Sequence, residues 1–316
     1  MKSWRYLGYG SLAIVGLMLI VMVGAVILPL PPLDTQPPHT LAYPDSQFVE
    51  IDGTSVHYRR WGEGSPTWVL LHGFGASTFS WRELMVPGVL PGTFYAFDRP
   101  AFGLTSRSFP GPYSEGDAVT LTFSLLDAWG VDDAIFVGHS AGARLAMFMA
   151  QEDPRRVQGL VLISPALSAP ARLPGWTERL LRSSWVEPLA RRLIRRALSS
   201  PYDALESAWY DTEQITQEVV DGYALPLKAD DWDRALWHFS LANLTQASGA
   251  VALDGVAVET LLIVGSEDQI IAPEATAQKA EQAEKVDVHR VEAGHVPHEE
   301  DPETVIELMR RYAGGR

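Results

Sequence analysis

The sequence contains no cysteine, and its basic side chains are fewer than its acidic ones. Without cysteine the chain can form no disulfide, iron–sulfur cluster, cysteine-ligated zinc site or thiolate nucleophile. The 25 lysines and arginines are outnumbered by 39 aspartates and glutamates, which gives a formal net charge of -14. Because nucleic-acid binding needs a clustered basic surface, we expect no nucleic-acid partner. The 316 residues are enough for one large domain, or for a domain with a sizeable insertion.

Charged residues are also missing from a long stretch near the N-terminus. An apolar run extends from about Leu7 to Leu30 and is preceded by Lys2 and Arg5. Its length suits the roughly 20 residues that cross a bilayer as a helix, so we predict a transmembrane signal anchor in residues 1–30. The basic residues precede the span, so the positive-inside rule places the rest of the chain on the extracytoplasmic side. The alternative is a signal peptide cleaved near Val23-Gly24-Ala25, which would release a secreted protein.

The rest of the chain divides into a linker, a core and an insertion. Residues 31–47 are rich in proline, and we predict a stiff extended linker there. Short apolar runs that suit strands buried on both faces then alternate with helix-like stretches, within 48–167 and again within 250–316. This alternation predicts an α/β core with a mostly parallel central sheet flanked by helices. Residues 168–249 lack the strand pattern and contain several tryptophans, so we predict a helical cap inserted between two strands.

A serine flanked by small residues carries the clearest chemical signal. The segment Gly138-His139-Ser140-Ala141-Gly142 lies between a predicted strand at 134–137 and a helix-like run that begins at about Gly142. A tight strand-to-helix turn of this kind exposes the serine hydroxyl, and the small residues on either side let the turn close. We therefore predict that Ser140 is a nucleophile. The alternative for the pattern is an ordinary glycine-rich turn.

A second glycine-flanked position completes a predicted oxyanion hole. The predicted strand 67–71 is followed by His72-Gly73-Phe74-Gly75, where the glycines have no side chain to block the backbone. We expect the backbone amides of Phe74 and Ala141 to donate hydrogen bonds to an oxyanion. His72 precedes Ser140 in the chain, whereas the base follows the serine in folds with this turn, so we expect His72 to shape the loop.

The general base and its carboxylate partner are expected late in the chain. His295 lies in a loop after a predicted strand at 286–291 and has a glycine before it. Asp268 follows a predicted strand at 260–264, and this placement gives the chain order Ser, Asp, His. We predict that His295 takes the proton of the nucleophile and that Asp268 orients the imidazole.

Other titratable residues lie close to these positions. His289 is inside a predicted strand and His298 is at the start of a helix, so we expect a surface or a packing role for both. Glu267 is adjacent to Asp268 but should point elsewhere. The segment from Asp98 to Gly103 follows an early strand, and we expect an interaction of Asp98 or Arg99 to close a structural turn there.

These motifs together resemble the α/β-hydrolase superfamily, over residues from about 47 to 311. The resemblance is to the serine-nucleophile branch, which includes esterases, haloperoxidases and carbon–carbon bond hydrolases. The matching motifs are His72-Gly73-Phe74-Gly75, Asp98-Arg99-Pro100-Ala101-Phe102-Gly103, the turn around Ser140, Gly265-Ser266-Glu267-Asp268 and Gly294-His295. The resemblance implies the α/β-hydrolase fold, with no cofactor and no metal. It disfavours epoxide hydrolase and haloalkane dehalogenase activities, because those relatives carry aspartate where this chain has Ser140.

The sequence therefore predicts a membrane-anchored serine hydrolase of a carboxylic ester or related acyl substrate. The substrate would be a small molecule or a lipid-like ester, and the sequence does not indicate an oligomeric state. Carbon–carbon bond hydrolysis of a diketone-like substrate is the second hypothesis, and a non-catalytic, membrane-tethered binding protein is the third. The cap also has a local excess of arginines that could rest on anionic lipid, or could be a solvated helix face: Arg191, Arg192, Arg195 and Arg196.

Overall fold

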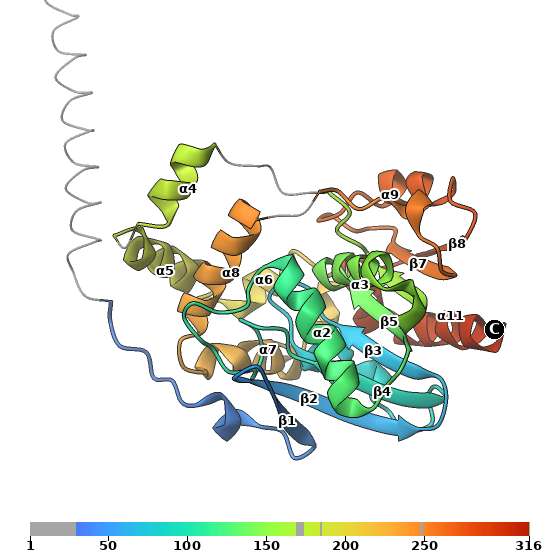
Figure 1. Ribbon diagram of the computed structural model, residues 1–316, viewed down its shortest axis with the longest axis horizontal. Helices are drawn as coiled ribbons and strands as arrows, with labels where there is room; N and C mark the ends of the chain where they lie inside the picture. The colour runs from blue at the N-terminus through green and yellow to red at the C-terminus, as the bar shows by residue number, and fades with distance from the viewer. Residues whose placement is uncertain (1–29, 169–173, 184, 247–248, 316) are drawn as a thin grey trace, which may run out of the picture.

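The computed structural model describes residues 30–168, 174–183, 185–246 and 249–315 (Figure 1). The predicted membrane anchor, residues 1–30, lies outside the described residues except for Leu30. Within the described ranges, no helix has both the length and the apolar character needed to cross a bilayer.

An eight-stranded sheet forms the centre of the domain, in the order β1-β2-β4-β3-β5-β6-β7-β8. The strands are β1 (Ser46–Ile51), β2 (Thr54–Glu63), β3 (Thr67–Leu71), β4 (Gly92–Phe97), β5 (Ala134–His139), β6 (Val157–Ile163), β7 (Thr260–Gly265) and β8 (Val286–Val291). Strand β2 is antiparallel to both of its neighbours, and the other adjacent pairs are parallel. The predicted α/β fold with a mostly parallel sheet is confirmed.

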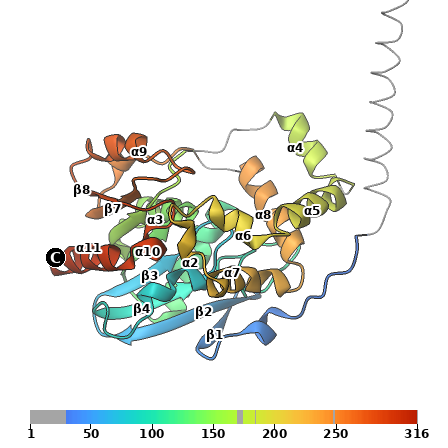
Figure 2. The same cartoon turned by 180° about the vertical axis from the view of Figure 1, so that it is seen from behind.

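Helices cover both faces of the sheet because its strands are apolar on both sides. In β3, Val69 and Leu71 belong to one buried cluster and Trp68 and Leu70 to the other, as the two-residue repeat of a strand requires. The first cluster includes residues of α2 (Glu115–Trp129), α3 (Ala141–Glu152) and α9 (Pro273–Ala280). The second includes residues of the 3-10 helix η2 (Thr78–Leu84) and α11 (Pro302–Gly314), which comes after the short α10 (Pro297–Glu300). Figures 1 and 2 view these layers from opposite sides.

A group of helices lies between β6 and β7 and forms the cap. They are α4 (Gly175–Leu181), α5 (Val186–Ala197), α6 (Pro201–Glu206), α7 (Gln217–Ala224) and α8 (Trp232–Gln246). Trp232 and Leu236 of α8 pack against Phe102 and Tyr113 of the core, and this contact fixes the cap over the sheet. Both views place the cap at the end of the molecule opposite the C-terminus (Figures 1 and 2).

The proline-rich linker is attached to the cap through backbone atoms of Gln36 and Pro31. The Gln36 amide donates to the Lys228 carbonyl and the Gln36 carbonyl accepts from the Asp230 amide, both at 2.9 Å. The Pro31 carbonyl accepts a 2.6 Å hydrogen bond from Arg195 on α5. The prolines of this segment have no backbone N–H to donate, so the N–H that pairs with the cap comes from Gln36. The start of the described chain therefore lies against the cap.

Two of the four cap arginines have a structural role. Arg191 and Arg195 on α5 donate to the carboxylate of Asp233 on α8, at 2.9 and 2.7 Å. Asp233 is only 1% exposed, so the two guanidinium groups compensate a buried charge and join the two helices. The suggestion that all four arginines form a lipid-facing surface is therefore wrong for these two.

Candidate active site

Ser140 occupies a strained turn between β5 and α3. Its φ of 51° and ψ of -114° lie in a region that non-glycine residues rarely adopt. The turn is held by a 2.9 Å hydrogen bond from the Ser140 amide to the Ile163 carbonyl. Among the described residues, none makes a hydrogen bond with the Ser140 hydroxyl, so the structure does not join Ser140 and His295 by a direct hydrogen bond.

The glycines on either side of Ser140 are required by close packing. A Cβ atom on Gly142 would lie 1.9 Å from the Leu71 carbonyl oxygen, and one on Gly138 would lie 2.4 Å from the Ala143 Cα. Both distances are far below van der Waals contact. The first residues of α3 can therefore approach the end of β3 only because position 142 has no side chain.

The loop after β3 lies directly against the Ser140 turn. A Cβ atom on Gly73 would be 3.4 Å from the Ser140 Cβ and 2.7 Å from His139 Nδ1. Phe74 and Ala141, whose amides we predict to form the oxyanion hole, line the same cavity of about 430 Å³. The structure thus brings both predicted oxyanion residues to one cavity beside Ser140.

Asp268 and His295 form a buried pair. The Asp268 Oδ2 lies 2.8 Å from His295 Nδ1, and Asp268 Oδ1 accepts from the Ile270 and Ile271 amides at 2.8 and 2.9 Å. Burial alone would raise the pKa of Asp268, but the hydrogen bond and charge of His295 and the two amides lower it. The carboxylate accepts from Nδ1–H, so the other ring nitrogen, Nε2, is left to accept a proton.

His139 holds the His295 loop against the Ser140 turn. The His139 Nε2 donates to the His295 carbonyl at 2.8 Å, and the two rings lie 4.8 Å apart. On the other side, the His295 amide donates to the carbonyl of Ala208 in the cap at 2.7 Å. Sequence reasoning missed both contacts. The position of His139 inside the pentapeptide was an available signal, whereas Ala208 offers none.

The competing histidines are engaged elsewhere. His298 is fully buried, with its ring 4.8 Å from that of His139 and 4.7 Å from that of Trp81. Burial lowers the pKa of His298 to about 3, so the ring is uncharged and packs in the core. His289 lies on β8, where its Nε2 is 2.9 Å from the carboxylate of Asp287 on the surface. The predicted packing and surface roles agree with these positions.

A second Ser–His–Asp chain of hydrogen bonds lies outside this site. The Ser46 Oγ is 2.7 Å from His57 Nε2, and His57 Nδ1 is 2.7 Å from Asp98 Oδ2. Asp98 also accepts from the amides of Thr78 and Leu104, at 2.6 and 2.7 Å. Burial opposes ionisation, but His57 and the Leu104 amide lower the pKa of Asp98 to about 2. Ser46 begins strand β1, and the amides that Asp98 accepts from lie in the segments after β3 and β4, so this group closes a turn, as we expect for Asp98.

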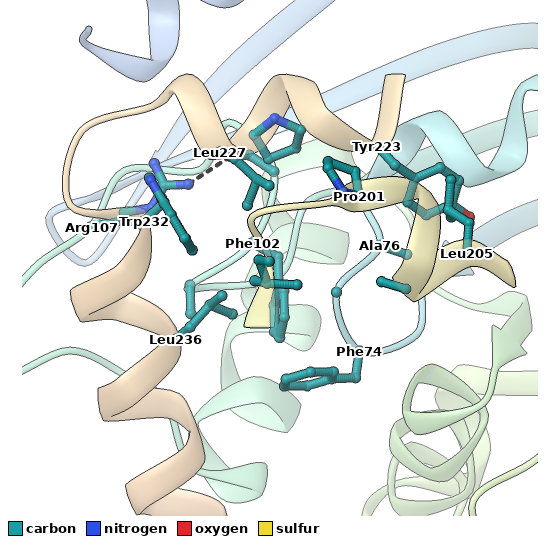
Figure 3. Close-up of a pocket in the computed structure, with 16 residues that line it drawn as sticks. Phe74, Ala76, Phe102, Arg107, Pro201, Leu205, Tyr223, Leu227, Trp232 and Leu236 are labelled. Carbon is teal, nitrogen blue, oxygen red and sulfur yellow. Dashed lines mark hydrogen bonds between the residues drawn. The ribbon is translucent and has the colours of Figure 1, made fainter. Parts of the chain in front are cut away.

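A second, smaller cavity of about 90 Å³ lies between the core and the cap (Figure 3). Its lining is mostly apolar, and Figure 3 shows Phe74 and Phe102 of the core opposite Trp232 and Leu236 of the cap. Phe74 lines both cavities. In the part of the chain that the structure describes, no three histidine, aspartate or glutamate side chains gather as a metal site.

Comparisons with known proteins identify relatives over most of the chain. The model of a family described as "Alpha/beta hydrolase family" matches residues 68–308. A dihydrolipoyllysine-residue acetyltransferase component of an acetoin cleaving system, from Cupriavidus necator, is 27% identical over 85% of this chain and 69% of its own length. A 2-hydroxy-6-oxononadienedioate/2-hydroxy-6-oxononatrienedioate hydrolase from Dechloromonas aromatica is 27% identical over 73% of this chain and 81% of its own.

A solved structure with the same fold belongs to a membrane phospholipase A described as a bacterial virulence factor. It is 22% identical and has a TM-score of 0.64, covering 99% of this chain and 96% of that one.

Proposed function

Because this chain belongs to the alpha/beta hydrolase family, we propose that it is a serine hydrolase that cleaves carboxylic esters or related acyl compounds through Ser140, His295 and Asp268. One observation carries the proposal. The strained Ser140 turn precedes α3, and His139 holds a buried His–Asp pair against the same turn. A strained serine beside an oriented imidazole is the arrangement that activates a hydroxyl as a nucleophile.

The proposed reaction has two steps. In the first, His295 Nε2 takes the Ser140 proton as Oγ attacks the carbonyl carbon, and the amides of Phe74 and Ala141 donate to the resulting oxyanion. The tetrahedral intermediate collapses, the bond to the leaving alkoxide breaks, and His295 returns the proton to it. In the second, His295 deprotonates a water that attacks the acyl-enzyme, which releases the acid and restores Ser140. Asp268 holds the required tautomer throughout and stabilises the imidazolium.

The cavities support an acyl substrate. The larger cavity contains the proposed oxyanion residues, and the smaller one offers an apolar wall for a hydrocarbon group. Carbon–carbon bond hydrolysis of a diketone-like substrate is the second candidate, and the similarity to the Dechloromonas aromatica hydrolase favours it. The same three residues would serve both reactions, so the leaving group distinguishes them.

The test of this proposal compares two serines that each belong to a Ser–His–Asp group. We expect the protein to hydrolyse p-nitrophenyl esters, and Ser140→Ala to lower kcat by roughly 10⁴-fold or more, because the nucleophile is removed. The matched control, Ser46→Ala, should keep kcat within about threefold, since Ser46 lies outside the site. Hydrolysis that survives Ser140→Ala, or that depends on Ser46, would contradict the proposal, and a protein without any hydrolytic activity would favour the binding-protein hypothesis.

We also propose that residues 1–30 attach the protein to a membrane, with the catalytic domain on the extracytoplasmic side. The apolar run and its preceding basic residues support this proposal. Because Pro31 is hydrogen-bonded to α5, the cap would be the part of the domain nearest the attachment. We expect the full chain to stay with membranes after alkaline carbonate extraction and a chain beginning at residue 31 to be released. Release of the full-length chain, or its recovery as a shortened secreted form, would overturn the anchor.

A further inference from the structure

A buried arginine lies in the cavity that contains the proposed oxyanion hole. Arg99 follows β4, is 5% exposed, and lines the 430 Å³ cavity together with Phe74 and Ala141. The mechanism proposed above gives it no role. A guanidinium group in this position is costly to bury unless its charge meets a partner.

Arg99 forms no salt bridge among the described residues, although the nearby charge of Glu115 raises its pKa and partly offsets the effect of burial. Its Nε and Nη2 atoms are buried and make no hydrogen bond within the described part of the chain. The acidic side chain that lines the same cavity is Glu115, and it forms an ion pair with Arg144, whose Nε and Nη2 donate to its two carboxylate oxygens. Burial lowers the pKa of Arg99 to about 10, which still leaves the group positively charged at neutral pH.

The position of Arg99 is fixed by the surrounding loops. Its backbone amide donates to His72 Nε2 at 3.0 Å, and His72 is fully buried at the end of β3. Its guanidinium carbon lies 5.2 Å from the centre of the Phe102 ring. These contacts hold the Arg99 side chain in the wall of the cavity, so little side-chain entropy would be lost when it binds a ligand.

We propose that Arg99 binds a carboxylate of the substrate, so that the preferred substrates are acyl compounds with a second, anionic carboxylate group. This inference rests on the proposed hydrolase function. The planar guanidinium fork matches a carboxylate with two parallel hydrogen bonds. The charged residues that line this cavity are Arg99, Arg144 and Glu115, and together they carry one net positive charge, which suits a monoanion better than a phosphate dianion.

The first experiment compares two substrates that differ in one charge. One is the p-nitrophenyl half-ester of adipic acid, and the other is the same compound with its free carboxylate capped as a methyl ester. We expect Arg99→Gln to lower kcat/KM for the anionic half-ester by roughly 30- to 100-fold, as for a lost charged hydrogen bond, and to change the capped ester by less than about threefold. Equal losses on both substrates would overturn the proposal.

A second buried arginine gives a matched control. Arg107 lines the smaller cavity, has two nitrogens without a hydrogen-bond partner, and donates from Nη2 to the Gly103 carbonyl at 2.9 Å. Figure 3 shows its side chain at the edge of that cavity, beside Trp232. We expect Arg107→Gln to keep the ratio of kcat/KM between the two substrates. A ratio that changes in Arg107→Gln and not in Arg99→Gln would assign carboxylate binding to the other cavity and contradict the inference.

The second experiment measures binding without turnover. In Ser140→Ala, calorimetry should detect monomethyl adipate, and adding Arg99→Gln should weaken its binding at least about tenfold. Tighter binding of glycerol phosphate than of monomethyl adipate in this assay would contradict the carboxylate assignment.

A thermal unfolding experiment tests whether Arg99 is only structural. The Arg99→Gln variant should keep the melting temperature of the unaltered protein, whereas replacing a purely structural arginine would lower the melting temperature. Fluorophosphonate labelling separates the two proposals. If the unaltered protein is labelled but does not prefer the anionic substrate, only the role of Arg99 is overturned. If the unaltered protein is not labelled at all, the hydrolase function is overturned.

Discussion

Replacing His295 with alanine should lower kcat for ester hydrolysis by roughly 10⁴-fold or more, because it removes the base that we propose takes the Ser140 proton. Asp268→Asn should lower it by roughly 10⁴-fold, because an amide presents its N–H to Nδ1 and favours the wrong tautomer. Steady-state and single-turnover kinetics with a p-nitrophenyl ester measure both effects. The geometry behind the prediction is the 2.8 Å contact between Asp268 Oδ2 and His295 Nδ1.

The two losses should not add. If Asp268 acts only through His295, the double variant His295→Ala/Asp268→Asn should be within about threefold of His295→Ala alone. A further loss approaching the product of the single effects would show that Asp268 has an independent role. The surface pair of His289 and Asp287 is the matched control, and His289→Ala should keep kcat within about twofold, because that pair is remote from Ser140 in the sheet.

Asp98→Ala should lower the free energy of unfolding by about 3 to 5 kcal/mol, because it leaves a buried histidine and two buried amides without their acceptor. The groups that lose their partner are His57 Nδ1 and the amides of Thr78 and Leu104. Asp98 is 1% exposed, so water cannot replace the carboxylate freely. Denaturant unfolding followed by fluorescence measures the change.

An exposed ion pair provides the control for this prediction. Asp45 contacts Arg59 at 2.7 Å, but its side chain is 48% exposed, so Asp45→Ala should cost less than about 1 kcal/mol. A loss for Asp98→Ala no larger than that for Asp45→Ala would show that the His57–Asp98 pair does not stabilise the fold. Loss of catalysis in a correctly folded Ser46→Ala variant would instead assign this group a chemical role.

The strands were predictable because two-sided burial leaves a strong signal. The run 67–71 coincides with β3, and the run 286–291 coincides with β8. The turn at Ser140 was predictable for a similar reason, since Gly138 lets the start of α3 fold back closely on the end of β5 and Gly142 lets α3 approach the neighbouring strand β3. In each case one local pattern reports a physical constraint that acts at the same position.

Contacts between distant segments were not predictable. The carbonyl of Ala208 binds the His295 amide through its backbone, so the identity of residue 208 contains no information about the contact. The pairing of Arg191 and Arg195 with Asp233 depends on how α5 packs on α8, which the charge pattern of α5 alone does not report. Sequence reasoning likewise assigned a turn to Asp98 without detecting its partner His57, because the pair joins β2 to the loop after β4.

The most direct test of the central proposal is to find which serine becomes covalently modified. The protein would be treated with a fluorophosphonate, digested, and mapped by mass spectrometry. We predict one modified serine, Ser140, with labelling slowed in His295→Ala because the hydroxyl is no longer activated. Modification of Ser46 instead, or equal labelling of several surface serines, would contradict the assignment of Ser140 as the nucleophile.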